Sequence, residues 1–212
     1  MDAKFWHDRW QEGRLGFHEG KVNRMLEAHF DALGLTQGQR VFLPLCGKAI
    51  DIPWLLSKGY SVVGAELSEI AVHDLFSEMA VTPEVTDTGR HRRYAAEGID
   101  IFVGDIFDLS ASVLGQVDAV YDRAALVALP EDMRARYAAH LAGITECAPQ
   151  LLVTFEYDQS AMAGPPFSIS EQEVARCHGE RFTINLLTDQ DVPGGLKGVV
   201  AAREKALLLR PV

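Results

Sequence analysis

The stretch Arg40-Val41-Phe42-Leu43-Pro44-Leu45-Cys46-Gly47-Lys48, together with Val62-Val63-Gly64-Ala65-Glu66-Leu67-Ser68, decides the fold of this 212-residue chain. Both stretches begin with an apolar run that predicts a buried strand, and a tight turn with one glycine ends the first. With the helical segment between them, they form a strand–helix–strand unit, the first half of a nucleotide-binding sheet. Glu66 follows the turn by about twenty residues, where such sheets place a carboxylate that binds ribose hydroxyls.

The turn after residues 40–45 lacks the G-x-G-x-x-G pattern of dinucleotide-binding sheets. Pro44, Leu45 and Cys46 place side chains where a pyrophosphate would need close approach of the backbone. We therefore predict an adenosine cofactor without phosphate, S-adenosylmethionine, beside Leu45 and Gly47. A dinucleotide-dependent oxidoreductase is the alternative, favoured only by Lys48 at a helix N-terminus.

Apolar runs and helical periodicity extend this pattern along the chain. Strands are predicted at 40–45, 61–66, 99–103, 117–122 and 150–156, and a C-terminal antiparallel hairpin at 182–186 and 198–208. Helices are predicted at 3–12, 22–33, 48–58, 69–79 and 130–143, and another ends near Gly179. We therefore predict an α/β fold, a Rossmann-like, doubly wound, mostly parallel seven-stranded sheet. Residues 1–212 are expected to form one domain, with two N-terminal helices in segment 1–35 as a lid.

Composition and charge exclude several classes of function. The formal net charge of −10 and the lack of a basic run argue against nucleic-acid binding. No apolar stretch approaches the roughly 18 residues of a membrane-spanning helix, and the N-terminus lacks the apolar segment of a signal peptide. Cys46, Cys147 and Cys177 lie far apart, without metal-ligand spacing, which indicates reduced thiols. We expect a cytoplasmic monomer with no metal site and no membrane partner.

Ligands of open α/β sheets bind where the parallel strands end at their carboxyl edge. This rule selects the following residues at five predicted strand ends: Leu45, Cys46, Gly47, Glu66, Asp105, Ile106, Asp122, Arg123, Tyr157 and Asp158. Glu66 is either a solvated carboxylate at a helix start or, as we favour, the ribose ligand. Asp105 is either a turn residue or reads the adenine amino group, with Ile106 packed on the base. Arg123 either pairs with a nearby acid such as Asp122 or presents a fixed positive charge to a nucleophile.

Two segments are candidates to close over this edge. Trp6 and Trp10 lie one turn apart on the first predicted helix. They either anchor this helix to the core or reach the ligand, and in the second case Trp10 and Phe17 contact the cofactor and an aromatic substrate. Segment 164–167, Gly-Pro-Pro-Phe, is either a second lid or a rigid connector. No Ser/His/Asp arrangement or other nucleophile–base pair is evident, which is consistent with methyl transfer, because displacement at a sulfonium needs alignment and desolvation more than a covalent catalyst.

The same motifs resemble one family, the thiopurine S-methyltransferases, particularly the bacterial type. The resemblance runs in order through most of the chain and rests on Phe5-Trp6-His7-Asp8-Arg9-Trp10, Gly16-Phe17-His18, the two stretches quoted first, Ile106-Phe107-Asp108-Leu109, residues 121–129 (YDRAALVAL) and Gly164-Pro165-Pro166-Phe167. Two departures, Pro53 early in a predicted helix and Ala125, lie away from the proposed site.

This resemblance implies a methyltransferase fold in which S-adenosylmethionine methylates the sulfur of a small aromatic or heterocyclic thiol, such as a thiopurine. It implies cofactor-pocket positions at Trp10, Leu45, Glu66 and Arg123, with Ile106 beside the adenine. Phe17 is similar to the substrate-packing aromatic of the family, and Arg123 to the catalytic arginine that favours the acceptor thiolate. Two alternatives stay open: another small acceptor, such as a selenium or tellurium species, a halide or a hydroxyl, and a non-catalytic cofactor-binding module.

Overall fold

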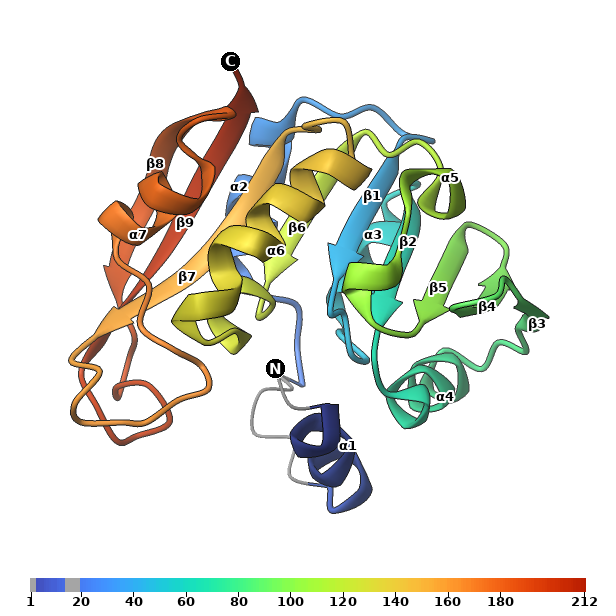
Figure 1. The fold of residues 1–212 in the computed structure, drawn as a ribbon, viewed down its shortest axis with the longest axis horizontal. Helices are drawn as coiled ribbons and strands as arrows, with labels where there is room; N and C mark the ends of the chain where they lie inside the picture. The colour runs from blue at the N-terminus through green and yellow to red at the C-terminus, as the bar shows by residue number, and fades with distance from the viewer. Residues whose placement is uncertain (1–2, 14–19) are drawn as a thin grey trace.

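The computed structural model describes residues 3–13 and 20–212, whose strands form one mixed nine-stranded sheet (Figure 1). The strands are β1 (Arg40–Pro44), β2 (Ser61–Glu66), β3 (Glu84–Asp87), β4 (Arg92–Ala96), β5 (Ile99–Val103), β6 (Ala119–Arg123), β7 (Gln150–Tyr157), β8 (Phe182–Asp191) and β9 (Ala202–Pro211). The α-helices are α1 (Ala3–Gln11), α2 (Arg24–His29), α3 (Asp51–Ser57), α4 (Glu69–Glu78), α5 (Ala111–Leu114), α6 (Glu131–Ile144) and α7 (Glu171–His178). Short 3-10 helices are η1 (Phe30–Leu33), η2 (Ile106–Asp108) and η3 (Leu126–Ala128).

The centre of the sheet is parallel, as the unalternating apolar strands predict. The strand order is β3-β4-β5-β2-β1-β6-β7-β9-β8, and the run from β5 to β7 is parallel throughout. β9 pairs antiparallel with β7, and β8 pairs antiparallel with β9, so the predicted C-terminal hairpin is confirmed. All five parallel strands therefore end at one edge.

The predicted number of seven strands was wrong, because β4 and β3 extend the sheet beyond β5 as a further antiparallel hairpin. Every residue of β3 is exposed, and in β4 only Tyr94 is buried. These strands contain no apolar run, so hydrophobic periodicity gives no signal for them.

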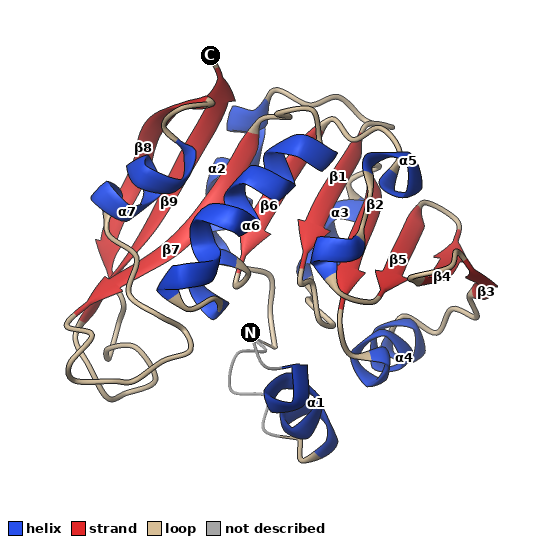
Figure 2. Cartoon of the chain, in the orientation of Figure 1, coloured by secondary structure: helices blue, strands red, loops and turns tan. Residues whose placement is uncertain are grey.

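Helices cover both faces of the sheet (Figure 2). One apolar cluster joins α5, α6 and α7 to side chains such as Phe42 and Val63, and the other joins α2, α3 and α4 to their neighbours Val41 and Val62. Successive strand residues point to opposite faces, which explains why both of each pair are apolar. No helix of the described residues is long and apolar enough to cross a membrane.

The two N-terminal helices differ in their packing, contrary to the expectation that both form a lid. Met25 and Leu26 of α2 are fully buried in the apolar cluster on one face of the sheet, and Asn23 caps this helix by accepting the N–H of Met25. The described side chains of α1 belong to neither cluster. This helix lies beyond the carboxyl edge of the parallel strands, at the bottom of Figure 1.

Candidate functional site

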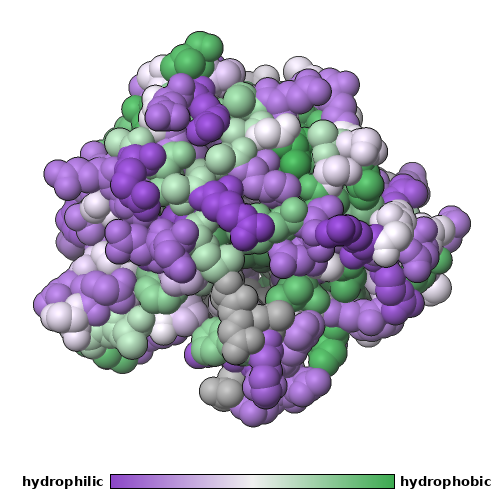
Figure 3. Space-filling model, viewed as in Figure 1, coloured by the Kyte–Doolittle hydropathy of each residue, from purple (hydrophilic) through white to green (hydrophobic). Residues whose placement is uncertain are grey.

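A cavity of about 560 Å³ opens at the carboxyl edge of the parallel strands, a volume typical of small-molecule sites. The face shown in Figure 3 is largely hydrophilic and is hollowed near its centre, above α1. The cavity brings together these predicted site residues: Trp10, Leu45, Gly47, Glu66, Asp105, Ile106 and Arg123. Phe17, the predicted substrate contact, lies outside the described residues.

Glu66 ties the end of β2 to the turn after β1. One carboxylate oxygen accepts the N–H of Gly47 and the other accepts the N–H of Ser68, each at 2.8 Å. The side chain is 6% exposed, and burial raises the pKa of the carboxyl, while these backbone N–H groups act in the opposite direction. The carboxylate is thus held rigidly at the wall of the cavity, with lone pairs to spare for a ligand.

The turn after β1 is shaped by two left-handed residues and by contact with α1. Leu45 has φ 47° and Gly47 has φ 53°. A Cβ atom on Gly47 would lie 3.2 Å from Cζ2 of Trp10, which is 5% exposed. Glycine is favoured here because the left-handed backbone strains other residues and because a Cβ atom would press on the indole.

Asp105 serves as a turn residue, as one of its two interpretations predicts. Its carboxylate accepts the N–H of Phe107 at 2.9 Å and caps η2, and its carbonyl lies 3.0 Å from Nε2 of His91. The buried Ile106 follows it on the cavity wall. Asp105 itself is exposed at the cavity, so the adenine contact stays a prediction.

Arg123 is the last residue of β6, and its neighbour Asp122 holds the loop that follows. The fully buried Asp122 carboxylate accepts the N–H of Leu126 at 3.0 Å and the hydroxyl of Tyr137 at 2.8 Å. Burial raises the pKa of Asp122 to about 6. These contacts assign Asp122 to holding the loop, which passes through Ala124 at φ 65°, and leave Arg123 to line the cavity.

Three further charged residues that line the cavity were missed by the sequence reasoning, namely Asp51, Arg24 and Glu204. Asp51, 2% exposed, accepts the N–H of Asn23 at 2.8 Å and the hydroxyl of Tyr121 at 3.2 Å. Glu204 of β9 pairs with Arg24 at 2.8 Å. From the sequence alone, Asp51 is recognisable only as an acidic residue in the first turn of a predicted helix. Arg24 and Glu204 stand 180 residues apart, and only the strand order brings them together.

The wall beyond β7 is built by two loops that are joined to each other. Pro165 and Pro166 line the cavity together with Leu196 and Lys197, and Nζ of Lys197 donates to the carbonyl of Pro165 at 2.8 Å. The hydroxyl of Tyr157 supports this wall by donating to the carbonyl of Pro166 at 2.6 Å. These contacts favour the rigid connector for segment 164–167.

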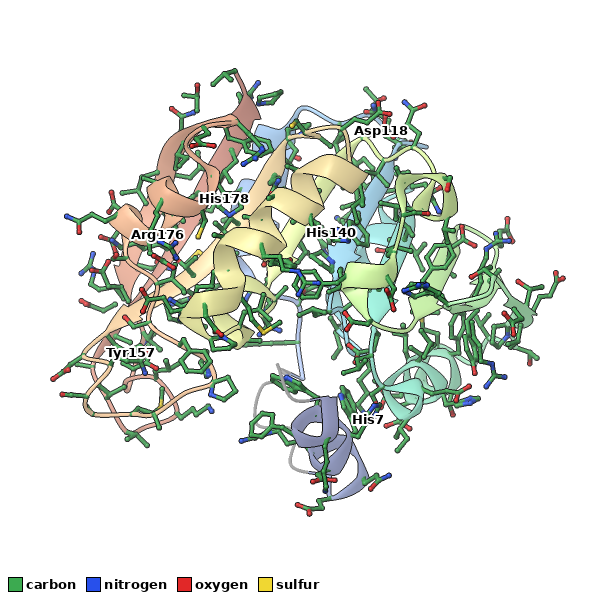
Figure 4. All side chains as sticks on the ribbon, in the orientation of Figure 1. His7, Asp118, His140, Tyr157, Arg176 and His178 are labelled. Carbon is green, nitrogen blue, oxygen red and sulfur yellow. The ribbon has the colours of Figure 1, made fainter. Side chains whose placement is uncertain are left out.

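Three predicted strand-end residues do not line the cavity: Asp122, whose carboxylate faces Leu126 and Tyr137, and the pair Tyr157 and Asp158. Tyr157 is labelled in Figure 4 at the loops beyond β7, and Asp158 bonds with Ser160. Among residues 3–13 and 20–212, no group of three or more His, Cys, Asp or Glu side chains could hold a metal ion.

Comparisons with known proteins agree on one family. The family model described as "Thiopurine S-methyltransferase (TPMT)" matches residues 1–210. The thiopurine S-methyltransferase of Xanthobacter autotrophicus is 56% identical over 210 residues, covering 99% of each chain. That of Teredinibacter turnerae is 53% identical, covering 96% of this chain and 95% of the other.

Solved structures show the same fold at low sequence identity. The 1,6-didemethyltoxoflavin-N1-methyltransferase of Burkholderia thailandensis, with bound 1,6-didemethyltoxoflavin and S-adenosylhomocysteine, matches with a TM-score of 0.67 and 16% identity, covering 98% of this chain and 87% of that chain. The magnesium protoporphyrin IX methyltransferase of Synechocystis, with bound S-adenosylmethionine, has a TM-score of 0.62 and 16% identity, covering 99% and 97%. At this identity the likeness concerns the fold alone.

Proposed function

The chain belongs to the thiopurine S-methyltransferase family, and on this premise we propose that it methylates the sulfur of aromatic and heterocyclic thiols such as thiopurines. S-adenosylmethionine is the methyl donor, and S-adenosylhomocysteine and an S-methyl thioether are the products. The observation that carries this proposal is the placement of Glu66 and Arg123 in one cavity at the carboxyl edge of the sheet. The proposal includes a cytoplasmic monomer; the three free cysteines are consistent with a reducing compartment.

The donor groups of the cavity fit an adenosine cofactor. Glu66 is a fixed carboxylate, which suits two neighbouring ribose hydroxyls, and Ile106 offers an apolar surface for the base. Asp105 is assigned to the adenine amino group. Leu45, Gly47 and Trp10 enclose the adjoining part of the cofactor, and the side chains of the turn leave no cradle for a pyrophosphate.

The buried Asp51 is the acid assigned to the ammonium group at the methionine end of the cofactor, because it lines the cavity from the start of α3. When bound, the cofactor supplies an electrophilic methyl carbon on a sulfonium. Sequence analysis offered no residue for this end, and Asp51 supplies the missing opposite charge.

Arg123 is assigned the electrostatic contribution to methyl transfer, which adds to the alignment and desolvation that the cavity provides. A fixed guanidinium near the acceptor lowers the pKa of a thiol, so that its proton passes to solvent and the thiolate lone pair forms the new sulfur–carbon bond as the sulfonium–carbon bond breaks. The apolar walls at Pro165, Pro166 and Leu196 exclude water from this step. Phe17 is assigned to packing on the acceptor ring, together with Trp10.

Methyl transfer from labelled S-adenosylmethionine to 6-mercaptopurine tests this function, with S-adenosylhomocysteine quantified as product. Turnover is the expected result. Tight cofactor binding without turnover on thiols would contradict the acceptor assignment and favour another acceptor or a non-catalytic binding module. Absence of both binding and turnover would remove the role of Glu66 as well.

Replacement of Arg123 by Ala separates catalysis from binding. We expect kcat to fall by about 10²-fold or more, a loss typical of a removed electrostatic contact, while the Kd of S-adenosylhomocysteine changes much less. Rapid kinetics measures kcat, and calorimetry measures the Kd of S-adenosylhomocysteine. Equal losses in both would make Arg123 a binding residue only.

A further inference from the structure

The mouth of the cavity carries positive charge that the cofactor does not explain. The chain has a formal net charge of −10, yet Arg9 and Lys197 both line the cavity, one from α1 and the other from the loop between β8 and β9. Of the carboxylates that line it, Glu204 is paired with Arg24, while Asp51, Glu66 and Asp105 accept hydrogen bonds from backbone N–H or hydroxyl groups. Among the described residues, none of the four forms an ion pair with Arg9 or Lys197.

Lys197 is positioned by an unusual loop. Its backbone has φ 54° in the left-handed region, between Gly195 at φ 80° and Gly198 at φ 68°, and a bridge between Leu196 and Val200 closes the loop. Strained backbone of this kind is often found at functional sites. The ammonium has three N–H donors, and one is bound to the carbonyl of Pro165. The part of the chain that the structure describes offers no further partner for the other two.

Arg9 brings a second charge to the cavity from helix α1. Its guanidinium lies 4.5 Å from the centre of the Phe5 ring, and its buried Nε has no hydrogen-bond partner within residues 3–13 and 20–212. Desolvation and, next, the charge of Arg9 lower the pKa of Lys197. The two cations are therefore close enough to repel each other, and a negative charge between them would offset that repulsion.

We propose that Lys197 and Arg9 bind an anionic substituent of the methyl acceptor, so that the preferred acceptors are aromatic thiols that also carry a carboxylate or a similar anion. This inference rests on the proposed S-methyltransferase function. The cofactor is a poorer occupant, because Glu66 and Ile106 place adenosine at the ends of β2 and β5 and its carboxylate shares a carbon with the ammonium group that is assigned to Asp51. Lys197 lies beyond β7, on the other side of Arg123 in the strand order.

An anion bound there would also link two parts of the protein that have separate supports. Arg9 belongs to α1, and Lys197 belongs to the wall formed with Pro165. The acceptor would thus hold α1 against the far wall while its sulfur faces Arg123. Neutral thiols of the same shape lack this link and are expected to bind more weakly.

Matched acceptors test the proposal directly. The 2-, 3- and 4-mercaptobenzoates are compared with the corresponding mercaptobenzamides, which keep the ring and thiol but lack the carboxylate charge. For the best ring position we expect kcat/KM to favour the acid by about tenfold or more in the unaltered protein, the effect of a hydrogen bond to a charged group. In Lys197→Met this preference should fall toward unity through the KM of the acid, and in Lys197→Glu it should reverse.

Controls keep this test separate from the proposed function itself. Lys58→Met removes a lysine that lies over Trp54, away from the cavity, and should keep the preference for the acid. Arg9→Gln should reduce the preference in the same direction as Lys197→Met. The Kd of S-adenosylhomocysteine should stay unchanged in Lys197→Met and in Arg9→Gln.

Two results would overturn the inference while leaving the methyltransferase function intact. One is equal kcat/KM for acid and amide, or a preference for the acid that persists in Lys197→Met. The other is a loss of cofactor affinity in Lys197→Met with no change in acceptor KM, which would assign the charge to the cofactor carboxylate. Lack of methylation of every thiol by the unaltered protein would instead be a failure of the proposed function.

Discussion

At the scale of single residues, Glu66 combines a structural and a ligand-binding task. Its two oxygens accept backbone N–H groups from Gly47 and Ser68, so the same carboxylate that is assigned to ribose also closes the turn. Asp122 has no ligand assigned to it, although the strand-end rule selects it equally. The difference lies in direction: its oxygens face Leu126 and Tyr137 inside the protein.

Glu66→Gln should weaken both tasks at once. An amide replaces one acceptor oxygen with a donor, which leaves a backbone N–H without its partner and lowers stability. The lost hydrogen bond to a ribose hydroxyl costs about 1–3 kcal/mol of binding, which corresponds to roughly 5- to 150-fold in the Kd of S-adenosylhomocysteine. Calorimetry measures the Kd, and a thermal melt should show a lower Tm. The exposed Glu27→Gln is the matched control. An unchanged Kd would end the ribose assignment.

Asp122 gives a prediction about pH. Burial raises its pKa from 3.8 to about 6, so the folded protein holds the proton more tightly than the unfolded chain. Its contribution to stability is therefore complete below about pH 4, falls as the pH rises toward 6 and is constant above. A difference of about two pKa units corresponds to a change on the order of 3 kcal/mol.

Urea unfolding of the unaltered protein and of Asp122→Asn measures this contribution. The free energy of unfolding of the unaltered protein, minus that of the variant, should decrease between pH 4.5 and pH 7.5, because asparagine does not titrate. Subtraction removes the contributions of all other carboxyl groups. Parallel pH profiles for the two proteins would show that the carboxyl does not titrate in this range.

At the scale of elements, the turn after β1 and helix α1 depend on each other. Trp10 packs against Gly47, whose N–H is in turn bound by Glu66. The contact links the helix at the mouth of the cavity to the first loop of the sheet. Because none of the described side chains of α1 belongs to the apolar clusters, contacts such as that of Trp10 with the turn hold this helix in place.

Gly47→Ala tests this contact, and Gly34→Ala is its control. Both glycines have positive φ, 53° and 71°, but a Cβ atom on Gly34 meets nothing within 4 Å. Each variant should lose about 1 kcal/mol of stability through backbone strain. Only Gly47→Ala should also raise the Kd of S-adenosylhomocysteine, because it displaces Trp10. Equal Kd values would show that the indole adapts freely.

Truncation of a buried side chain should mainly reduce stability in α2 and mainly reduce ligand binding and activity in α1. Leu26→Ala in α2 should cost about 2–5 kcal/mol of stability, because it leaves a cavity in a packed core. Trp10→Ala in α1 should cost less stability but should weaken cofactor binding and lower kcat/KM. Chemical denaturation and calorimetry on both variants decide the matter. A large stability loss in Trp10→Ala would assign α1 to the core.

At the scale of the whole molecule, the sequence predicts the parallel sheet well because its strands are continuous apolar runs of ordinary length. The observed β2 and β5 keep the predicted bounds, 61–66 and 99–103. The hairpin of β3 and β4 was missed because its exposed residues carry no periodic pattern. The second helix was misplaced in a lid because the apolar side chains of an amphipathic helix do not say which surface they cover.

The sequence likewise predicts the part of the site that is built from the parallel strands, and not the part that is built from the antiparallel strands. Residues at the ends of parallel strands, such as Glu66 and Arg123, follow from the rule that those ends meet at one edge. Lys197 and Glu204 come from antiparallel segments and line the cavity only because of the strand order. Their positions depend on pairing between distant strands, which local sequence does not encode.

The order of the last three strands in the sheet, β7-β9-β8, affects how the protein folds while it is synthesised on the ribosome. β8 is synthesised before β9, yet β9 lies between β8 and β7, and within the described residues β8 pairs with β9 alone. Until β9 emerges, nascent β8 has no strand to pair with, and β7 keeps an open edge of the kind that promotes aggregation. Because Glu204 of β9 also lines the cavity, a nascent chain acquires a complete site only when this late strand inserts.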